Sequence, residues 1–105
     1  MFRKIDIHNL ESISPKLYEF GKDYLFADIW QRPVLDTQTR CFITITTLVL
    51  QGRYSQLEWH VKNALTQGIT KEQIIEAITH IAFYAGLPNA ISALEHMPEE
   101  IWSCP

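Results

Sequence analysis

Glycines at positions 52, 68 and 86 divide the second half of the chain into segments of helical length. Each stands where an apolar repeat stops, and glycine commonly ends helices because it adopts a left-handed backbone without strain. Between the last two, Thr70 and Gln73 have the spacing of a capping box, which marks the start of a helix. These start and stop signals predict a succession of helices.

Apolar residues between these glycines recur every three or four positions, which is typical of helices with one buried face. Pro88 suits the first turn of the last segment, and Pro98 closes that segment before a short tail that contains Trp102. The apolar positions of the three segments are Leu57, Val61, Ala64 and Leu65, then Ile74, Ile78, Ile81, Ala82 and Ala85, then Ala90, Ile91, Leu94 and Met97.

Residues 41–50 are ambiguous. Their β-branched side chains and the Ile-Thr-Ile-Thr alternation favour a strand on local propensity. The length from the capping position, Asp36 or Thr37, to Gly52 suits a helix better, and no second strand is evident to pair with it. These residues by themselves leave both a strand and a buried helix open.

The first third of the chain gives weaker signals. Residues 1–14 are predicted to be an extended lead-in, and Pro15 is placed to open a helix that Gly21 weakens. Residues 26–35 then form an aromatic-rich connector.

Composition excludes several classes of protein. The net charge of −3 lacks the basic excess of a nucleic-acid-binding protein. No apolar run reaches the roughly 18 residues of a membrane span, and the N-terminus lacks a signal peptide's pattern. Two cysteines do not make a disulfide framework, so a cytoplasmic protein is expected. A hydrophobic fraction of 47% in 105 residues exceeds what a small core needs and predicts a homo-oligomer.

His60 is the first candidate for chemistry. It is three or four positions from Leu57 and Ala64, and therefore shares the apolar side of its helix. One interpretation is a core histidine bonded to a backbone carbonyl. The other is a general acid or base at the floor of a pocket, with a pKa that burial moves.

Two further groups can line such a pocket. His80 and Tyr84 are one turn apart, so one helix face could offer an imidazole and a phenol together. The alternative is that Tyr84 packs at the turn around Gly86 and His80 faces solvent. Trp30 and Arg32 lie in the connector, where an arginine suits an anionic substrate. No histidine pair has a metal-ligand spacing, so no metal site is predicted.

The order of these pieces resembles the carboxymuconolactone decarboxylase family and, more distantly, the alkyl hydroperoxidase D-like proteins. The resemblance rests on Phe20-Gly21-Lys22-Asp23, Trp30-Gln31-Arg32-Pro33, Leu57 through His60 to Gly68, and Phe83 through Pro88. It implies one all-α domain over residues 1–105, a bundle of about five to six helices in which residues 41–50 form a buried helix. It also implies trimers or hexamers with pockets near subunit contacts, and a functional role for His60.

In the family pattern an arginine opens the helix before the histidine helix, and the next residue points toward the histidine. Here these residues are Arg40 and Cys41. The cysteine is either an inert buried residue or a thiol made nucleophilic beside His60. Arg40 either binds a substrate carboxylate or pairs with Asp36 at i,i+4.

Redox members of this superfamily carry a Cys-x-x-Cys pair just before the histidine, where this chain has Arg53 and Gln56. Neither side chain can form a disulfide, so dithiol peroxidase chemistry is excluded by that route.

Three functions remain. The leading prediction is a cofactor-independent enzyme, a lyase that transfers protons on a small anionic oxo-acid or lactone. In it His60, with Cys41 and His80, would be catalytic, while Trp30, Arg32, Arg40 and Tyr84 would bind substrate. The alternatives are a one-cysteine thiol antioxidant using Cys41 and His60, and a non-catalytic oligomeric module that binds a small molecule.

Overall fold

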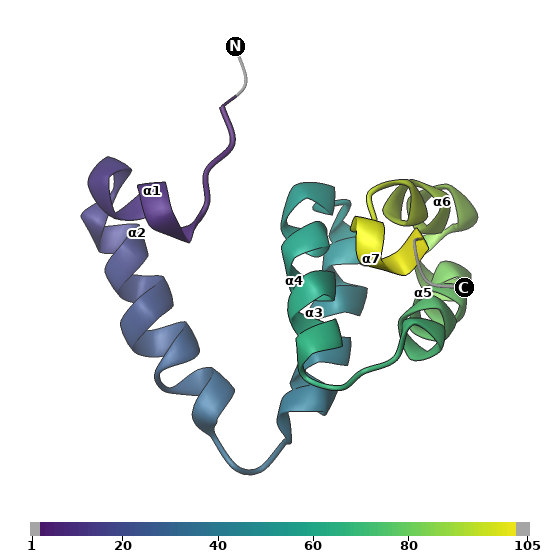
Figure 1. Cartoon of the computed structure of the whole chain (residues 1–105), viewed down its shortest axis with the longest axis horizontal. Coiled ribbons are helices and arrows are strands. Elements are labelled where there is room, and N and C mark those ends of the chain that lie inside the picture. Colours follow the sequence, from purple (N-terminus) through teal and green to yellow (C-terminus); the bar gives the residue numbers. More distant parts are fainter. Residues whose placement is uncertain (1–2, 103–105) are drawn as a thin grey trace. The chain divides into compact units, whose positions relative to one another are not determined.

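The computed structural model describes residues 3–102, which form helices and, within that range, no strand. The all-α prediction is confirmed. The chain divides into two compact units, one described over residues 3–35 and one over residues 36–102, and each is considered by itself. Figure 1 shows the helices in chain order.

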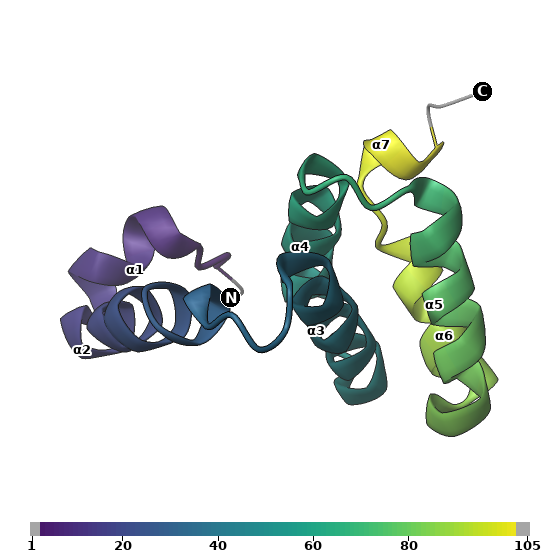
Figure 2. The ribbon, with the colours of Figure 1, turned by 90° about the horizontal axis from the view of Figure 1, so that it is seen from below.

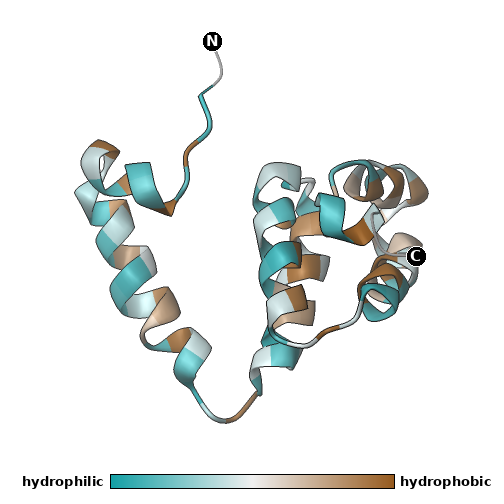
Figure 3. Cartoon of the chain, in the orientation of Figure 1, coloured by the Kyte–Doolittle hydropathy of each residue, from teal (hydrophilic) through white to brown (hydrophobic). Residues whose placement is uncertain are grey.

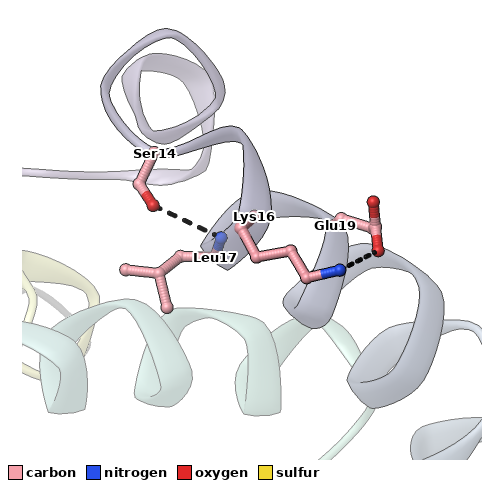
Figure 4. A network of polar contacts seen from close by, with 4 residues as sticks. All are labelled: Ser14, Lys16, Leu17 and Glu19. Carbon is pink, nitrogen blue, oxygen red and sulfur yellow. Dashed lines mark hydrogen bonds and ion pairs between the residues drawn. The ribbon is translucent and has the colours of Figure 1, made fainter.

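The first unit contains four helical elements: α1 (Ile7–Ile13), α2 (Pro15–Glu19), the π-helical η1 (Phe20–Phe26) and the 3₁₀ turn η2 (Ile29–Gln31). The predicted start at Pro15 is confirmed. The Ser14 side chain caps α2 by accepting a hydrogen bond from the Leu17 amide at 3.4 Å, and Lys16 pairs with Glu19 at 3.1 Å, as Figure 4 shows. Gly21 lies within η1, where α-helical geometry is replaced by π-helical geometry.

The prediction of an extended lead-in was wrong over α1. The Asp6 carboxylate accepts hydrogen bonds from the His8 and Asn9 amides at 2.9 and 3.1 Å, and the Asn9 side chain accepts one from the Asp6 amide at 2.9 Å. This reciprocal cap satisfies backbone donors that a short helix otherwise leaves open. This cap is hard to predict from the sequence, because asparagine stands where a capping box usually has Glu or Gln.

The second unit is a helical bundle built on α3 (Thr37–Gln51), which contacts α4 (Tyr54–Thr66), α5 (Lys71–Ala85) and α6 (Leu87–Glu95). Residues 41–50 are therefore helical, as expected. Figure 2 shows α5 and α6 lying side by side. The core comes from every helix of this unit: Cys41, Ile45, Val49, Leu57, Val61, Ala64, Ile69, Ile74, Ile78, Ala90, Ala93, Met97 and Ile101.

The predicted helix ends are confirmed in this unit. Gly52 has φ +68° and lets the Arg53 amide reach back to the Leu48 carbonyl at 2.9 Å. Thr70 and Gln73 form the capping box, with hydrogen bonds of 3.1 and 2.9 Å. Gly86 separates α5 from α6 with φ +97°.

Two details differ from expectation. Ile91 was predicted to lie on the buried face of α6, yet it is 47% exposed, because Ala90 and Ala93 face the bundle instead. The tail after Pro98 forms a short helix, α7 (Glu99–Trp102), which buries Ile101. Glutamates in its first turn favour that helix electrostatically.

All fully buried apolar side chains lie in the second unit, and among residues 3–35 none is buried. Among residues 3–102, every helix is too short or too polar to cross a bilayer.

Replacing Gly52 with alanine should lower the free energy of unfolding by about 1 kcal/mol, because a Cβ disfavours this left-handed backbone. Space is not limiting, since a Cβ would meet the Tyr54 hydroxyl at an ordinary 3.6 Å. Asparagine tolerates this conformation better, so Gly52→Asn should lose less. Urea unfolding of both variants checks this; equal losses would show that backbone strain is not the cause.

Candidate functional site

The candidate site is built on a hairpin of α3 and α4, which the short Gly52–Arg53 connection joins. The Gln38 side chain donates a hydrogen bond to the Gln67 carbonyl at 3.0 Å, which ties the far ends of the two helices together. Residues equally distant from the connection therefore lie level with each other. His60 is level with Ile45, and Cys41 lies one helical turn further out, about 6 Å along the axis.

His60 lies at the edge of the core. The neighbouring Leu57 and Val61 are fully buried, whereas the imidazole is half-buried. The Trp59 ring meets it edge-on, with ring centroids 4.8 Å apart and an interplanar angle of 84°. Burial disfavours the charged imidazolium and lowers the pKa of His60 below its ordinary value of 6.5. Trp59 is not among the site residues predicted from the sequence, although its position next to His60 was a usable signal.

Cys41 lies in the core, with 1% of its surface exposed, in line with Ile45 and Val49 along α3. Burial raises the pKa of its thiol. A redox-active or nucleophilic cysteine requires the opposite, a lowered pKa and access to solvent. Both observations argue against the thiol antioxidant.

Arg40 precedes Cys41 in the first turn of α3 and is half-buried, with its Nε atom fully buried. Asp36, its predicted partner, acts as the N-cap of this helix and accepts a hydrogen bond from the Thr39 amide at 2.7 Å. Hydrogen bonds from the Thr39 side chain and backbone lower the pKa of that carboxyl.

His80 and Tyr84 do lie together on one face of α5, with ring centroids 5.5 Å apart. Both side chains are exposed. Trp30 and Arg32 belong to the first unit, where Trp30 is half-buried in η2 and Arg32 is exposed just after it.

Tertiary packing also gives His96 a place that the sequence did not indicate. Its ring stacks on Tyr54 with centroids 5.0 Å apart, and its Nδ1 lies 2.8 Å from the Ser92 carbonyl, which can only accept a hydrogen bond. The Tyr54 hydroxyl lies 3.2 Å from the Asn89 side-chain oxygen and donates to it. This cluster joins the start of α4 to α6.

An open depression of about 240 Å³ lies in the first unit and contains none of the predicted site residues. Carboxylates predominate in its lining, which does not suit an anionic ligand. The residues that line the depression are Glu11, Pro15, Tyr18, Glu19, Lys22 and Asp23.

Within residues 3–102, no three His, Cys, Asp or Glu side chains are grouped so that they could hold a metal ion.

Comparison with known proteins assigns the family. The model of the carboxymuconolactone decarboxylase family matches residues 15–97. The chain belongs to this family. The matched range contains all seven predicted site residues, from Trp30 to Tyr84.

Three relatives are similar over most of this chain. It is 34% identical over 96 residues to a 4-carboxymuconolactone decarboxylase of Acinetobacter baylyi, covering 91% of this chain and 71% of that protein. It is 33% identical over 76 residues to a nitrosuccinic acid decarboxylase of Metarhizium robertsii, covering 72% and 53%. It is also 33% identical over 92 residues to an uncharacterized 15.0 kDa protein of Paracoccus denitrificans, covering 86% and 69%.

For this family member, stability should depend on pH through His60. Because the folded-state pKa lies below 6.5, the unfolded chain binds more protons as pH falls past that value. The free energy of unfolding should therefore be highest above pH 6.5 and should decline as the pH falls toward the folded-state pKa. Urea titrations at several pH values check this. His60→Gln should remove that part of the decline, and an unchanged pH dependence in the variant would contradict the assignment.

The Cys41 thiol should react with a thiol reagent much more slowly in the folded protein than in urea, because it is buried and its pKa is raised. A Cys104→Ser background leaves Cys41 as the only thiol. Fast labelling of the folded protein below pH 8 would contradict this and restore the antioxidant alternative.

Proposed function

We propose that this protein is a cofactor-independent decarboxylase acting on a small anionic oxo-acid or lactone. Its membership of the family and two decarboxylases among its relatives support this reaction class. The names of both relatives specify that a carboxyl group is lost from a small carboxylic acid. The chain spans 71% of the first and 53% of the second, so their activity reaches this protein only as a proposal.

The observation that carries the proposal is the half-buried imidazole of His60. When the substrate carboxylate leaves as carbon dioxide, the electron pair of the broken C–C bond remains on the substrate as an enolate. That enolate needs one proton on carbon to give the product. A histidine whose pKa is near or below neutrality is suited to deliver it.

A bound anion changes the state of this imidazole. Without substrate, burial keeps His60 largely neutral at pH 7. A substrate carboxylate nearby would favour the imidazolium and raise the pKa of His60, so substrate binding draws in the proton that the reaction consumes. After transfer to carbon, the neutral imidazole takes another proton from water.

A cationic side chain favours the binding of an anionic substrate, and we assign this role first to Arg40. It is half-buried at the start of α3, beside the helix that carries His60, and a partly desolvated guanidinium binds carboxylate bidentately. Arg32 and Trp30 remain substrate-binding candidates from the first unit, and His80 and Tyr84 from α5. Cys41 would contribute as a buried apolar wall rather than as a nucleophile.

We further propose that the enzyme is a homo-oligomer, a trimer or a hexamer. Its support is the number of large apolar side chains that one copy leaves in contact with solvent in both units.

His60→Gln should reduce carbon dioxide release from a panel of β-oxo acids and lactones by roughly 10²–10⁴-fold, the usual contribution of a general acid. For the wild type, kcat/KM should fall as pH rises through a value below 6.5, because the protonated imidazole is the reactive form. His8→Gln, an exposed histidine of α1, is the matched control.

Both variants should keep the wild-type circular dichroism spectrum. An unchanged rate in His60→Gln would remove this residue from catalysis. Tight ligand binding without turnover in the wild type would instead identify a non-catalytic binding module.

A further inference from the structure

The rings of Trp59 and His60 are in contact although the two residues are neighbours in the sequence of α4. Successive side chains of an α-helix leave its axis about 100° apart, so neighbours do not normally face each other. Here the ring centroids are 4.8 Å apart and the ring planes meet at 84°. Aromatic rings attract each other in this edge-to-face arrangement. The two side chains therefore lean toward each other.

The indole lies on the side of His60 that faces away from the core. With 3.6 residues per turn, Leu57, Val61 and Ala64 all lie on one side of His60 around the helix, and Trp59 lies on the other. Those three residues are fully buried, whereas Trp59 is 50% exposed. Figure 3 shows the hydrophobic residues of α4 in brown and its hydrophilic ones in teal. His60 thus has the core on one flank and the indole on the other.

The position of Trp59 serves His60 better than it serves the core. Because half of its surface remains in water, this side chain stabilises the core less than a buried tryptophan would. What it covers is an ionisable group. The imidazole of His60 is half-buried, and without the indole its outer flank would be more open to water.

We propose that Trp59 is a positioning residue of the His60 site, whose indole shields the imidazole from water on the flank away from the core. The shielding is a property of the folded chain and can be measured without any substrate. Its consequence for the reaction rests on the decarboxylase activity proposed above.

An indole acts on a neighbouring histidine in two ways that have opposite signs. Exclusion of water disfavours the imidazolium, whereas the π-face of an indole attracts a cation. Burial lowers the pKa of His60, so exclusion of water is the effect that agrees with the structure. Removal of the indole should therefore make protonation of His60 easier. In the proposed reaction, the shield makes the imidazolium a stronger acid toward the enolate carbon.

Other titratable side chains surround this position, and the test has to hold them constant. Helix α4 contacts α3 and α6. Apart from His60, the titratable residues of these three helices are Arg40, Cys41, Tyr54, Glu58, Lys62 and Glu95, and His96 follows directly after α6. Substitution of Trp59 leaves all of these groups in place, so a change in the pKa of His60 reports on the indole.

The test is an NMR titration of the histidine ring signals in the full-length protein, with His60→Gln identifying the signal of His60. Trp59→Ala should raise the pKa of His60 toward 6.5, because the ring then meets more water. Trp59→Gln, a second variant without a ring, should raise it as well. Trp59→Phe keeps an aromatic ring and should stay closer to the wild type. Circular dichroism checks that each variant is folded.

The pH profile of carbon dioxide release gives a second measurement. The fall of kcat/KM with rising pH should move to higher pH in Trp59→Ala, together with the pKa of His60, and Trp59→Phe should restore most of the wild-type profile. A residue that only stabilised the fold would lower the rate at every pH without moving this profile.

Phe83→Ala is the matched control, since Phe83 is an aromatic residue that is 85% exposed on α5. It should leave the pKa of His60 unchanged. The proposal is overturned if the pKa of His60 stays the same or falls in Trp59→Ala, if Phe83→Ala raises it equally, or if Trp59→Phe behaves like Trp59→Ala. Absence of carbon dioxide release from the wild type would reject the proposed function, while the NMR titration would still decide whether Trp59 shields His60.

Discussion

The buried stripe of α3, made by Cys41, Ile45 and Val49, supports the rest of the second unit. Because α4, α5 and α6 all contact α3, packing against this stripe determines the positions of the other helices. It places His60 at the border of the core and leaves the turn between α5 and α6 open to solvent. Burial of Ile45 and of Val49 stabilises the fold by on the order of 1.5–3 kcal/mol each. Most substitutions in this stripe would therefore destabilise the whole bundle.

The same burial has opposite consequences for the two reactive side chains of the hairpin. Removal from water disfavours whichever form is charged. For the thiol of Cys41 this is the thiolate, so its pKa rises and nucleophilic chemistry is suppressed. For His60 it is the imidazolium, so its pKa falls and the ring becomes a stronger acid once protonated. One physical effect thus separates proton transfer, which it favours, from thiol chemistry, which it opposes.

Apolar surface is distributed unevenly between the two units. The described part of the first unit buries no side chain. Even its large apolar residues Leu17, Phe20 and Tyr24, which follow one another along α2 and η1, are each more than half exposed. A segment of fewer than about 40 residues seldom forms a core of its own. The second unit, by contrast, has a core to which all of its helices contribute.

Helix boundaries and the candidate histidine were readable from the sequence because they depend on local chemistry. Gly52 and Gly86 adopt backbones that other residues resist, and the Thr70 cap needs only a neighbour three residues away. The helical state of residues 41–50 was harder, since β-branched side chains oppose it; in the structure Thr44 and Thr47 donate hydrogen bonds to the carbonyls four residues earlier. What only the tertiary structure decided was exposure: that Cys41 is sealed, that His60 is half-buried, that Ile91 faces outward and that His96 stacks on Tyr54. Periodicity tells which residues share a face of a helix, but the depth of that face depends on which neighbouring helices cover it, and that is set by packing between residues far apart in the chain.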